Sequence, residues 1–264
     1  MNLELKNKVA VVSGSTGGIG FGIATALAAE GAHVVVTGRT ELRIAQALDR
    51  IKQQVKDATL LGVGADLGTA HGVKTLLEQV PRTDILVNNL GVFEIKSFME
   101  ITDADWLRLF EVNVLSGVRL SRGYLPGMVK DNWGRIIFVS SESGQQVPSE
   151  MIHYGVTKTA QIALARGLAE AVTGTGVTVN SVLAGPTASE GVLDLIENIT
   201  KTEGISIADF ERQFFTKARP TSLLKRFEMI EEVAAVVAFI ASPRAIVING
   251  AAVRAEGGII RSIF

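Results

Sequence analysis

The sequence predicts an α/β fold in which a parallel sheet of about seven strands lies between two layers of helices. Short runs rich in β-branched residues alternate with segments of helical periodicity, and short loops connect them. This alternation is typical of a doubly wound parallel sheet with three α/β/α layers. The 264 residues suffice for one large domain, and no linker, internal repeat or low-complexity tract divides them.

Composition narrows the functional classes. Hydrophobic residues make up 47% of the chain, charged residues 20%, and the net charge is -1, as in ordinary soluble globular proteins. We therefore expect neither nucleic acid nor a membrane as partner. Cysteine is absent and the three histidines lie far apart, so we expect no disulfide, no metal site and a cytoplasmic location.

The first strand, over residues 8–12, leads into a glycine-rich turn. Gly14, Gly18 and Gly20 punctuate this turn, and a helical pattern then runs to a stop at Gly31. A strand, glycine-rich turn and helix in this order aim backbone N–H groups and a helix N-terminus at a phosphate. No Lys-Ser/Thr pair follows, so the turn is not a Walker A loop. The position favours a dinucleotide site.

The second strand, over residues 33–37, ends at Gly38 and Arg39. In dinucleotide folds an acidic residue here receives the ribose 2′-OH of NAD(H), whereas an arginine suits the 2′-phosphate of NADP(H). Gly38 offers no carboxylate, and a guanidinium binds phosphate with two parallel hydrogen bonds. NADP(H) is the predicted cofactor, and NAD(H) is the alternative. Arg39 could also be a solvated loop residue without a ligand.

The next two strands, over residues 59–63 and 84–87, end in polar turns. Asp66 follows the first of them, and Asn88 and Gly91 follow the second. Ligands bind along the carboxyl edge of such sheets, although Asp and Asn also favour turns for local reasons. An apolar helical pattern over 102–130 then contains Asn113, which is either a hydrogen-bonding core residue or a site residue.

The pair Tyr154 and Lys158 is the strongest candidate for chemistry. The fifth strand, over residues 134–139, leaves Ser141 at its carboxyl end, and a helix over 154–172 then places the Tyr and Lys side chains on one face. A tyrosine titrates near ~10, and a neighbouring cation favours the phenolate. The pair suits general acid/base catalysis. Alone, it also fits a surface Tyr and Lys one turn apart.

The last third of the chain contains a longer connection. A sixth strand over 176–183 precedes an insertion of about 187–221, which is charged and carries phenylalanines at helical spacing. It is a candidate lid over the substrate or a packed helical excursion. A helix over 228–240 and a strand over 251–253 finish the predicted domain, 1–264.

Taken together, the chain resembles the short-chain dehydrogenase/reductase family in its single-domain branch, which includes the 3-oxoacyl-carrier-protein reductases. The resemblance covers nearly the whole chain and rests on the Gly14/Gly18/Gly20 turn, Asp66, Asn88-Asn89-x-Gly91, Asn113, Ser141, Tyr154-x-x-x-Lys158 and the stretch from Asn180 to Ser189. It implies a Rossmann-type fold and an oxidoreductase that interconverts a carbonyl and a secondary alcohol. It also implies a homotetramer or homodimer that acts on a small molecule.

The resemblance assigns roles to individual residues. Tyr154 is expected to be the general acid/base, and Lys158 to hold the nicotinamide ribose and lower the pKa of Tyr154. Ser141 is expected to orient the substrate oxygen, and Asn113 to hold a relay water. The implied cofactor-binding residues are Gly14, Ser15, Thr16, Gly18, Ile19, Gly20, Arg39, Asp66, Leu67, Asn88, Gly91, Tyr154, Lys158, Thr187 and Ser189. Glu142, Gln145 and His153 are expected to shape the substrate pocket.

The chain departs from the family pattern without losing a catalytic group. Leu90 adds bulk near the expected ribose path, Ala184 stands where the family has proline, and Glu256 replaces an aspartate. Two other classes compete with the oxidoreductase interpretation. A serine hydrolase would need a G-x-S-x-G elbow, which the sequence lacks. A cofactor-binding regulator without turnover remains the alternative.

Overall fold

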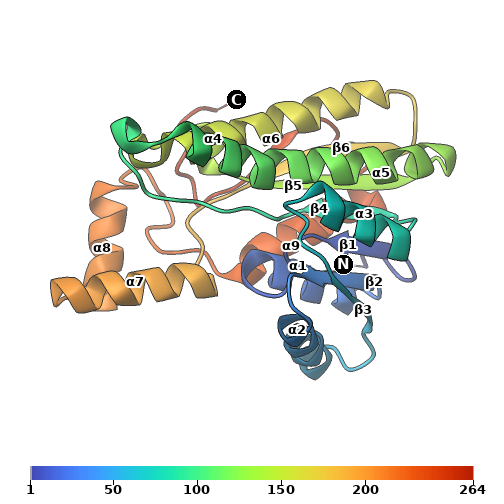
Figure 1. Ribbon diagram of the computed structural model, residues 1–264, viewed down its shortest axis with the longest axis horizontal. Helices are drawn as coiled ribbons and strands as arrows, with labels where there is room; N and C mark the ends of the chain where they lie inside the picture. Colours follow the sequence, from blue (N-terminus) through green and yellow to red (C-terminus); the bar gives the residue numbers. More distant parts are fainter. Residues whose placement is uncertain (1, 264) are drawn as a thin grey trace.

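The structure is a computed structural model that describes residues 2–263, and a seven-stranded sheet runs through its centre (Figure 1). All neighbouring strands are parallel, and their spatial order is β3-β2-β1-β4-β5-β6-β7. The strands are β1 Val9–Val12, β2 His33–Gly38, β3 Thr59–Gly64, β4 Ile85–Asn88, β5 Gly134–Ser141, β6 Val177–Ala184 and β7 Ala252–Ala255. This arrangement confirms the predicted fold class.

The strand order reverses between β1 and β4. The chain passes from β1 outward to β2 and β3, and then returns to lay β4 on the other side of β1. The connections that leave the carboxyl ends of β1 and β4 therefore run in opposite directions and open a crevice between them. Ala10 of β1 pairs with Val34 on one side and with Ile85 on the other.

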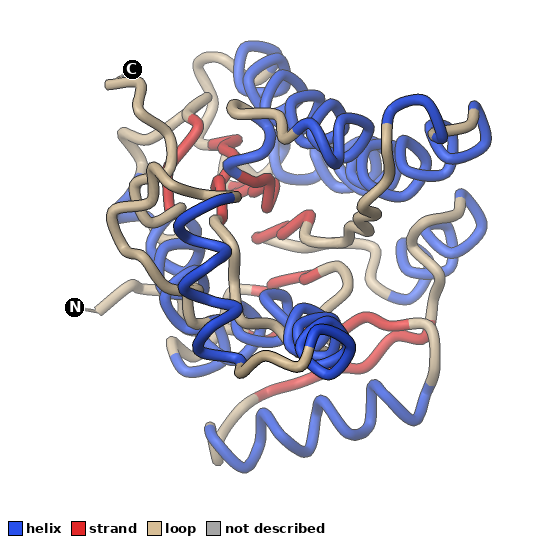
Figure 2. The backbone as a smooth tube through the Cα atoms, turned by 90° about the vertical axis from the view of Figure 1, so that its left-hand side faces the viewer, coloured by secondary structure: helices blue, strands red, loops and turns tan. Residues whose placement is uncertain are grey.

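Helices cover both faces of the sheet (Figures 1 and 2). Buried residues of α1, α2 and α9 pack on one face, and those of α3, α5 and α6 pack on the other. Successive residues of β1 serve the two faces in turn, with Ala10 and Val12 on the first and Val11 on the second. The helices are α1 Gly18–Ala29, α2 Glu41–Gln54, α3 Ala70–Gln79, α4 Asp103–Phe110, α5 Ser116–Lys130, α6 Ile152–Ala171, α7 Glu190–Glu203, α8 Ile207–Lys217 and α9 Ile230–Ala241.

The predicted helix over 102–130 is interrupted, which corrects one expectation. A π-helical turn, Glu111–Leu115, separates α4 from α5 and contains Asn113. A π turn inserts one extra residue into the helix, and such turns are frequent at functional sites. Hydrophobic periodicity does not reveal a single inserted residue, so no sequence pattern indicates this turn.

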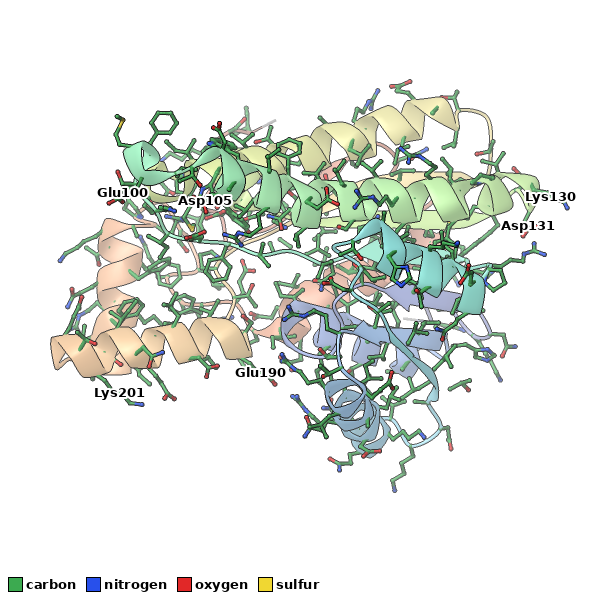
Figure 3. The ribbon with its side chains drawn as sticks, viewed as in Figure 1. Glu100, Asp105, Lys130, Asp131, Glu190 and Lys201 are labelled. Carbon is green, nitrogen blue, oxygen red and sulfur yellow. The ribbon has the colours of Figure 1, made fainter. Side chains whose placement is uncertain are left out.

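The insertion forms the two helices α7 and α8, which lie beside the sheet rather than on it (Figure 1). Glu190 and Lys201 lie on α7, with Glu190 at the end near the main body (Figure 3). The Phe214 ring of α8 stacks on Phe227 at a centroid distance of 5.2 Å. The insertion is therefore a packed helical segment. No described helix is long and apolar enough to cross a membrane.

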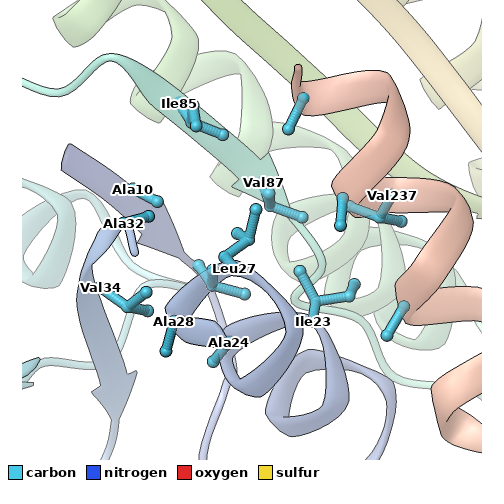
Figure 4. Close-up of a cluster of buried hydrophobic side chains, with 14 of the residues drawn as sticks. Ala10, Ile23, Ala24, Leu27, Ala28, Ala32, Val34, Ile85, Val87 and Val237 are labelled. Atoms are coloured by element: carbon cyan, nitrogen blue, oxygen red, sulfur yellow. The ribbon is translucent and has the colours of Figure 1, made fainter. Parts of the chain in front are cut away.

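Alanines and branched aliphatic side chains build the core beneath the crevice. Ile23 and Leu27 of α1 lie beside Val87 of β4 and Val237 of α9 (Figure 4). Burying such a side chain stabilises the fold by about 1.5–3 kcal/mol. The core thus holds α1 and the carboxyl ends of β1 and β4 in fixed relative positions.

Candidate active site

A cleft of about 270 Å³ opens at the carboxyl ends of the central strands. Ser141, Tyr154 and Lys158 line it, together with residues of the glycine-rich turn. The predicted residues in its wall are Gly14, Gly18, Ile19, Gly20, Gly91, Ser141, Tyr154, Lys158 and Ser189. The structure therefore brings the candidate catalytic residues and the candidate cofactor turn to one place.

The Lys158 ammonium is buried and firmly held. Its Nζ donates hydrogen bonds to the Val139 backbone oxygen (2.9 Å) and to Gln161 Oε1 (3.2 Å). Ser140 Oγ donates to the Lys158 backbone oxygen, which ties α6 to the end of β5. Burial lowers the pKa of Lys158 to about 8, because it disfavours the charged form.

The pKa of Tyr154 lies above its ordinary value, which corrects the expectation of a lowered pKa. Burial of the hydroxyl is the main cause, and the negative charge of Glu142 is the next. The Lys158 ammonium lies 5.6 Å from the centroid of the tyrosine ring and bonds to other acceptors. In this form of the protein Tyr154 is a firmly protonated phenol, as a general acid must be before it gives up its proton.

Asn113 lies behind the cleft, and Gln161 joins it to Lys158. The Asn113 side chain bonds to both backbone groups of Val92 and to Thr157 Oγ1. The Gln161 amide donates to the Asn113 backbone oxygen at 2.6 Å and accepts from Lys158. Gln161 was missed because it reads as one polar residue within an apolar helix.

Ser141 contacts a buried ion pair. Its Oγ donates to Glu142 Oε2 at 2.7 Å and accepts from the Ser143 backbone N–H at 3.1 Å. Glu142 Oε1 in turn accepts from Arg219 Nε at 2.7 Å, and both side chains of this pair are less than a tenth exposed. Glu142 thus lies next to the Ser141 hydroxyl, which lines the cleft, whereas Arg219 comes from the chain after α8.

The glycine-rich turn fits a cofactor pyrophosphate. Gly14 and Gly18 have φ values of 64° and 56°, which other residues adopt with strain. A Cβ at Gly20 would lie 2.4 Å from Asn89 Nδ2, so only glycine fits there. The Gly17 N-cap of α1 has no side-chain partner, whereas Thr40 and Thr69 cap α2 and α3. The first N–H groups of α1 are therefore available to a phosphate.

A second cavity of about 320 Å³ follows the turn and fits the adenosine end of a dinucleotide. Arg39 and Arg43 both line it, with Thr16, Asp66 and Leu67. A Cβ at Gly38 would lie 2.5 Å from Thr16 Cγ2, so an acidic residue has no room there. Within residues 2–263 no carboxylate forms a salt bridge with either arginine. Arg43 lies among the polar residues of a helix, so its place in this cavity was not predicted.

Several predicted residues support these cavities from behind instead of lining them. Ser15, Asn88 and Thr187 are buried, and their side chains bond to neighbouring protein groups. Of the expected pocket residues, Gln145 is exposed and Glu142 is buried below Ser141. His153 is fully buried, and its ring meets Trp106 at 6.0 Å. Neither it nor Gln145 lines the cleft beside Tyr154.

Two further contacts frame the cleft. Leu90, which departs from the family pattern, lines both cavities. Its side chain lies 3.3 Å from the position that a Cβ atom would take at Gly14. It therefore narrows the passage between the two cavities. Glu190, at the start of α7 (Figure 3), forms a salt bridge of 2.9 Å with Arg50 of α2. This salt bridge links the insertion to α2, the helix that follows Arg39.

Comparison with known proteins identifies the class. Residues 8–199 match the family described as short chain dehydrogenase. The chain therefore belongs to the short-chain dehydrogenase/reductase family, and it is an oxidoreductase of alcohol and carbonyl substrates. It is 46% identical, over the full length of both chains, to an uncharacterised oxidoreductase of Bacillus subtilis, YvaG.

Solved structures agree with this assignment. L-sorbose reductase from Gluconobacter frateurii, in complex with NADPH and L-sorbose, is 31% identical with a TM-score of 0.93, and each chain covers all of the other. A putative NAD(P)-dependent gluconate 5-dehydrogenase from Beutenbergia cavernae, with bound NADP, is 29% identical with a TM-score of 0.86. The alignment covers 99% of this chain and 100% of that one. These likenesses support the use of NAD(P).

Proposed function

We propose that this protein is an NADP(H)-dependent enzyme that interconverts a carbonyl compound and a secondary alcohol, with Tyr154 as the general acid/base. One observation carries the proposal: Tyr154, Lys158 and Ser141 line the same cleft as a glycine-rich turn suited to a dinucleotide. The bound nicotinamide supplies or accepts the hydride. In reduction, the Tyr154 hydroxyl gives its proton to the carbonyl oxygen.

The neighbouring residues divide the remaining tasks. Ser141 orients the substrate oxygen. The Lys158 ammonium lies 3.5 Å from the position that a Cβ atom would take at Gly91. It therefore reaches the wall of the cleft where the nicotinamide ribose is expected. There its positive charge favours the phenolate that remains after proton transfer. The uncapped first turn of α1 holds the pyrophosphate.

The choice of NADP(H) rests on the two arginines of the adenosine cavity. Arg39 and Arg43 can bind a 2′-phosphate. Position 38 has no room for the acidic side chain that would bind the 2′-OH of NAD(H). The NADPH and NADP complexes of the similar structures agree with this choice. The alternative is an NAD(H)-dependent alcohol or sugar dehydrogenase of the same family.

We further propose one domain over 1–264, in which the insertion of about 187–221 covers the substrate. Leu107, Val129 and Val156 are exposed apolar residues on α4, α5 and α6. They suit the predicted pairing of these helices in a cytoplasmic homotetramer or homodimer. Light scattering at micromolar concentration tests the assembly, and a monomer would refute it.

The activity is tested by following NADPH oxidation with a panel of ketones, and NADP⁺ reduction with the matching alcohols. The likeness to L-sorbose reductase makes ketoses and polyols the first members of the panel. Parallel assays with NADH and NAD⁺ test the cofactor. Tight NADPH binding without turnover of any compound would instead favour a regulatory protein.

A further inference from the structure

Glu142 is a buried carboxylate in direct contact with Ser141, and the proposed reaction does not yet use it. Its side chain is 3% exposed. Its Oε2 accepts a hydrogen bond of 2.7 Å from Ser141 Oγ and another from the Ser143 hydroxyl. Its Oε1 accepts from Arg219 Nε at 2.7 Å. The carboxylate is thus surrounded by donors.

These contacts determine how the Ser141 hydroxyl faces the cleft. A serine hydroxyl carries one proton, and here that proton is donated to Glu142. The Ser141 oxygen can then only accept hydrogen bonds, and it already accepts one from the Ser143 backbone N–H. Toward the cleft it is an acceptor. An acceptor suits the O–H group of an alcohol better than the oxygen of a carbonyl.

Arg219 supplies the counter-charge of Glu142. A buried charge needs such a partner, because its removal from water is costly. The Arg219 guanidinium pairs with Glu142 and, at 3.3 Å, with the half-exposed Glu150. Because Arg219 follows α8, the insertion supplies the charge that fixes this arrangement.

We propose that Glu142, paired with Arg219, is a positioning residue that makes Ser141 a hydrogen-bond acceptor and favours the alcohol over the carbonyl form of the substrate. The inference rests on the proposed function and adds the preferred bound form. A carbonyl oxygen can bond to Ser141 only if the Ser141 hydroxyl turns its proton away from Glu142. Glu142 then loses this hydrogen bond and keeps those to Ser143 and Arg219.

The decisive variant is Glu142→Gln. The glutamine oxygen must face Arg219, which is a donor, so its NH₂ group faces the two serines and donates to them. Ser141 is then released to donate to a carbonyl. We expect the ratio of the KM of the alcohol to the KM of the ketone to rise about tenfold, as for one hydrogen bond. The enzyme cannot change the overall equilibrium, so the kcat ratio of oxidation to reduction must rise with it.

Two further variants serve as controls. Ser143→Ala removes the second hydroxyl on Glu142 Oε2, so Glu142 holds Ser141 more strongly and the KM ratio falls. Glu150→Gln changes the other carboxylate on Arg219, does not touch Ser141, and leaves the ratio unchanged. Unaltered NADPH affinity shows that each variant is folded.

A second readout needs no turnover. The chain has two tyrosines, so in a Tyr124→Phe background tyrosinate absorbance reports Tyr154 alone. Tyr154 is faced by Glu142, Arg219 and Lys158. Adding Glu142→Gln removes a negative charge and frees the Ser141 proton for the phenolate. Tyr154 should therefore ionise at lower pH.

The outcomes separate the two proposals. A wild-type protein that turns over no ketone and no alcohol overturns both, since the inference rests on the proposed function. Turnover with an unchanged KM ratio in Glu142→Gln overturns the inference alone. The inference is also overturned if Glu142→Gln, in the Tyr124→Phe background, leaves the pH at which Tyr154 ionises unchanged or raises it. Absence of ionisation below the pH of unfolding counts as the same outcome.

Discussion

The Gln161 side chain accepts a hydrogen bond of 3.2 Å from the Lys158 ammonium, and its amide donates at 2.6 Å to the Asn113 backbone oxygen. The side chains of Gln161 and Lys158 are both buried. One side chain therefore spans the distance between the lysine and the π turn. It bonds directly to Lys158 and to Asn113, the residue that the family resemblance expects to hold a relay water.

The first prediction follows from this contact. Gln161→Leu removes one of the two acceptors of the Lys158 ammonium, so the pKa of Lys158 falls below about 8. The alkaline limb of kcat/KM for NADPH, which reports the free enzyme, should move to lower pH. Gln161→Glu supplies an anionic acceptor and should move the limb to higher pH. Shifts in the same direction for both variants would contradict the assignment.

Tyr154→Phe tests the proton donor. The ring and its edge contact with Phe93, at 6.2 Å, remain, and only the hydroxyl is lost. Turnover should fall by about 10²–10⁴-fold or more, the usual contribution of a general acid, while NADPH affinity stays within about threefold. Stopped-flow measurement of NADPH oxidation and a fluorescence titration separate the two effects. Turnover at the wild-type rate would refute the mechanism.

Arg39→Ala and Arg43→Ala test the 2′-phosphate site. Each variant loses one charge-assisted contact of about 1.5–3 kcal/mol, so NADPH should bind roughly tenfold to a hundredfold more weakly. NADH affinity should change little, although stacking of Arg39 on adenine would lower it too. Arg50→Ala is the matched control, because Arg50 pairs with Glu190 outside this cavity. Wild-type protein that binds NADH as tightly as NADPH would overturn the assignment.

The buried Lys158 makes stability depend on pH. Its pKa is about 8 in the folded protein and about 10.5 in the unfolded chain. Between these values the unfolded state binds more protons, so the lysine opposes folding below about pH 8 and less so as pH rises. Lys158→Met should therefore be more stable than wild type at pH 7. This difference in the free energy of unfolding should shrink by about 3 kcal/mol between pH 7 and pH 10.5. Urea denaturation at both pH values measures this, and a constant difference would argue against a buried cation.

The glycine-rich turn gives a steric prediction. Alanine at Gly20 would place its Cβ 2.5 Å from the Gly14 backbone oxygen as well as against Asn89. Gly20→Ala should lower both the melting temperature and the NADPH affinity. At Gly191, in the first turn of α7, a Cβ meets no atom within 4 Å. Gly191→Ala should leave both unchanged, and equal effects of the two substitutions would show that the turn tolerates a side chain.

Local patterns predicted most of the fold. β-branched runs such as Val9–Val12 marked the strands, and the glycine turn with Arg39 located the cofactor cavities. Tyr154 and Lys158 lie one helical turn apart, so their shared face followed from spacing alone. These features depend on residues close together in sequence, where periodicity and turn chemistry are informative.

Other features depend on distant contacts or on single inserted residues. Glu142 and Arg219 are separated by 77 positions, and no pattern announces their pairing. The π turn around Asn113 adds one residue to a helix whose apolar pattern looks continuous. The raised pKa of Tyr154 arises from burial, which emerges only when several segments pack together. Sequence reasoning therefore selected candidate catalytic groups that line one cleft, but it missed the residues that surround them.

The pairing of Arg219 with Glu142 also limits how this enzyme can be recombined with its relatives. A chimera that receives residues 187–221 from a reductase without an arginine at this position would lose Arg219, and Glu142 would be left as a buried charge without its partner. Such a loss typically costs about 3–5 kcal/mol. The two positions must therefore be transplanted together. In laboratory evolution, the region around α8 and the residue after Ser141 should accept substitutions as a linked pair.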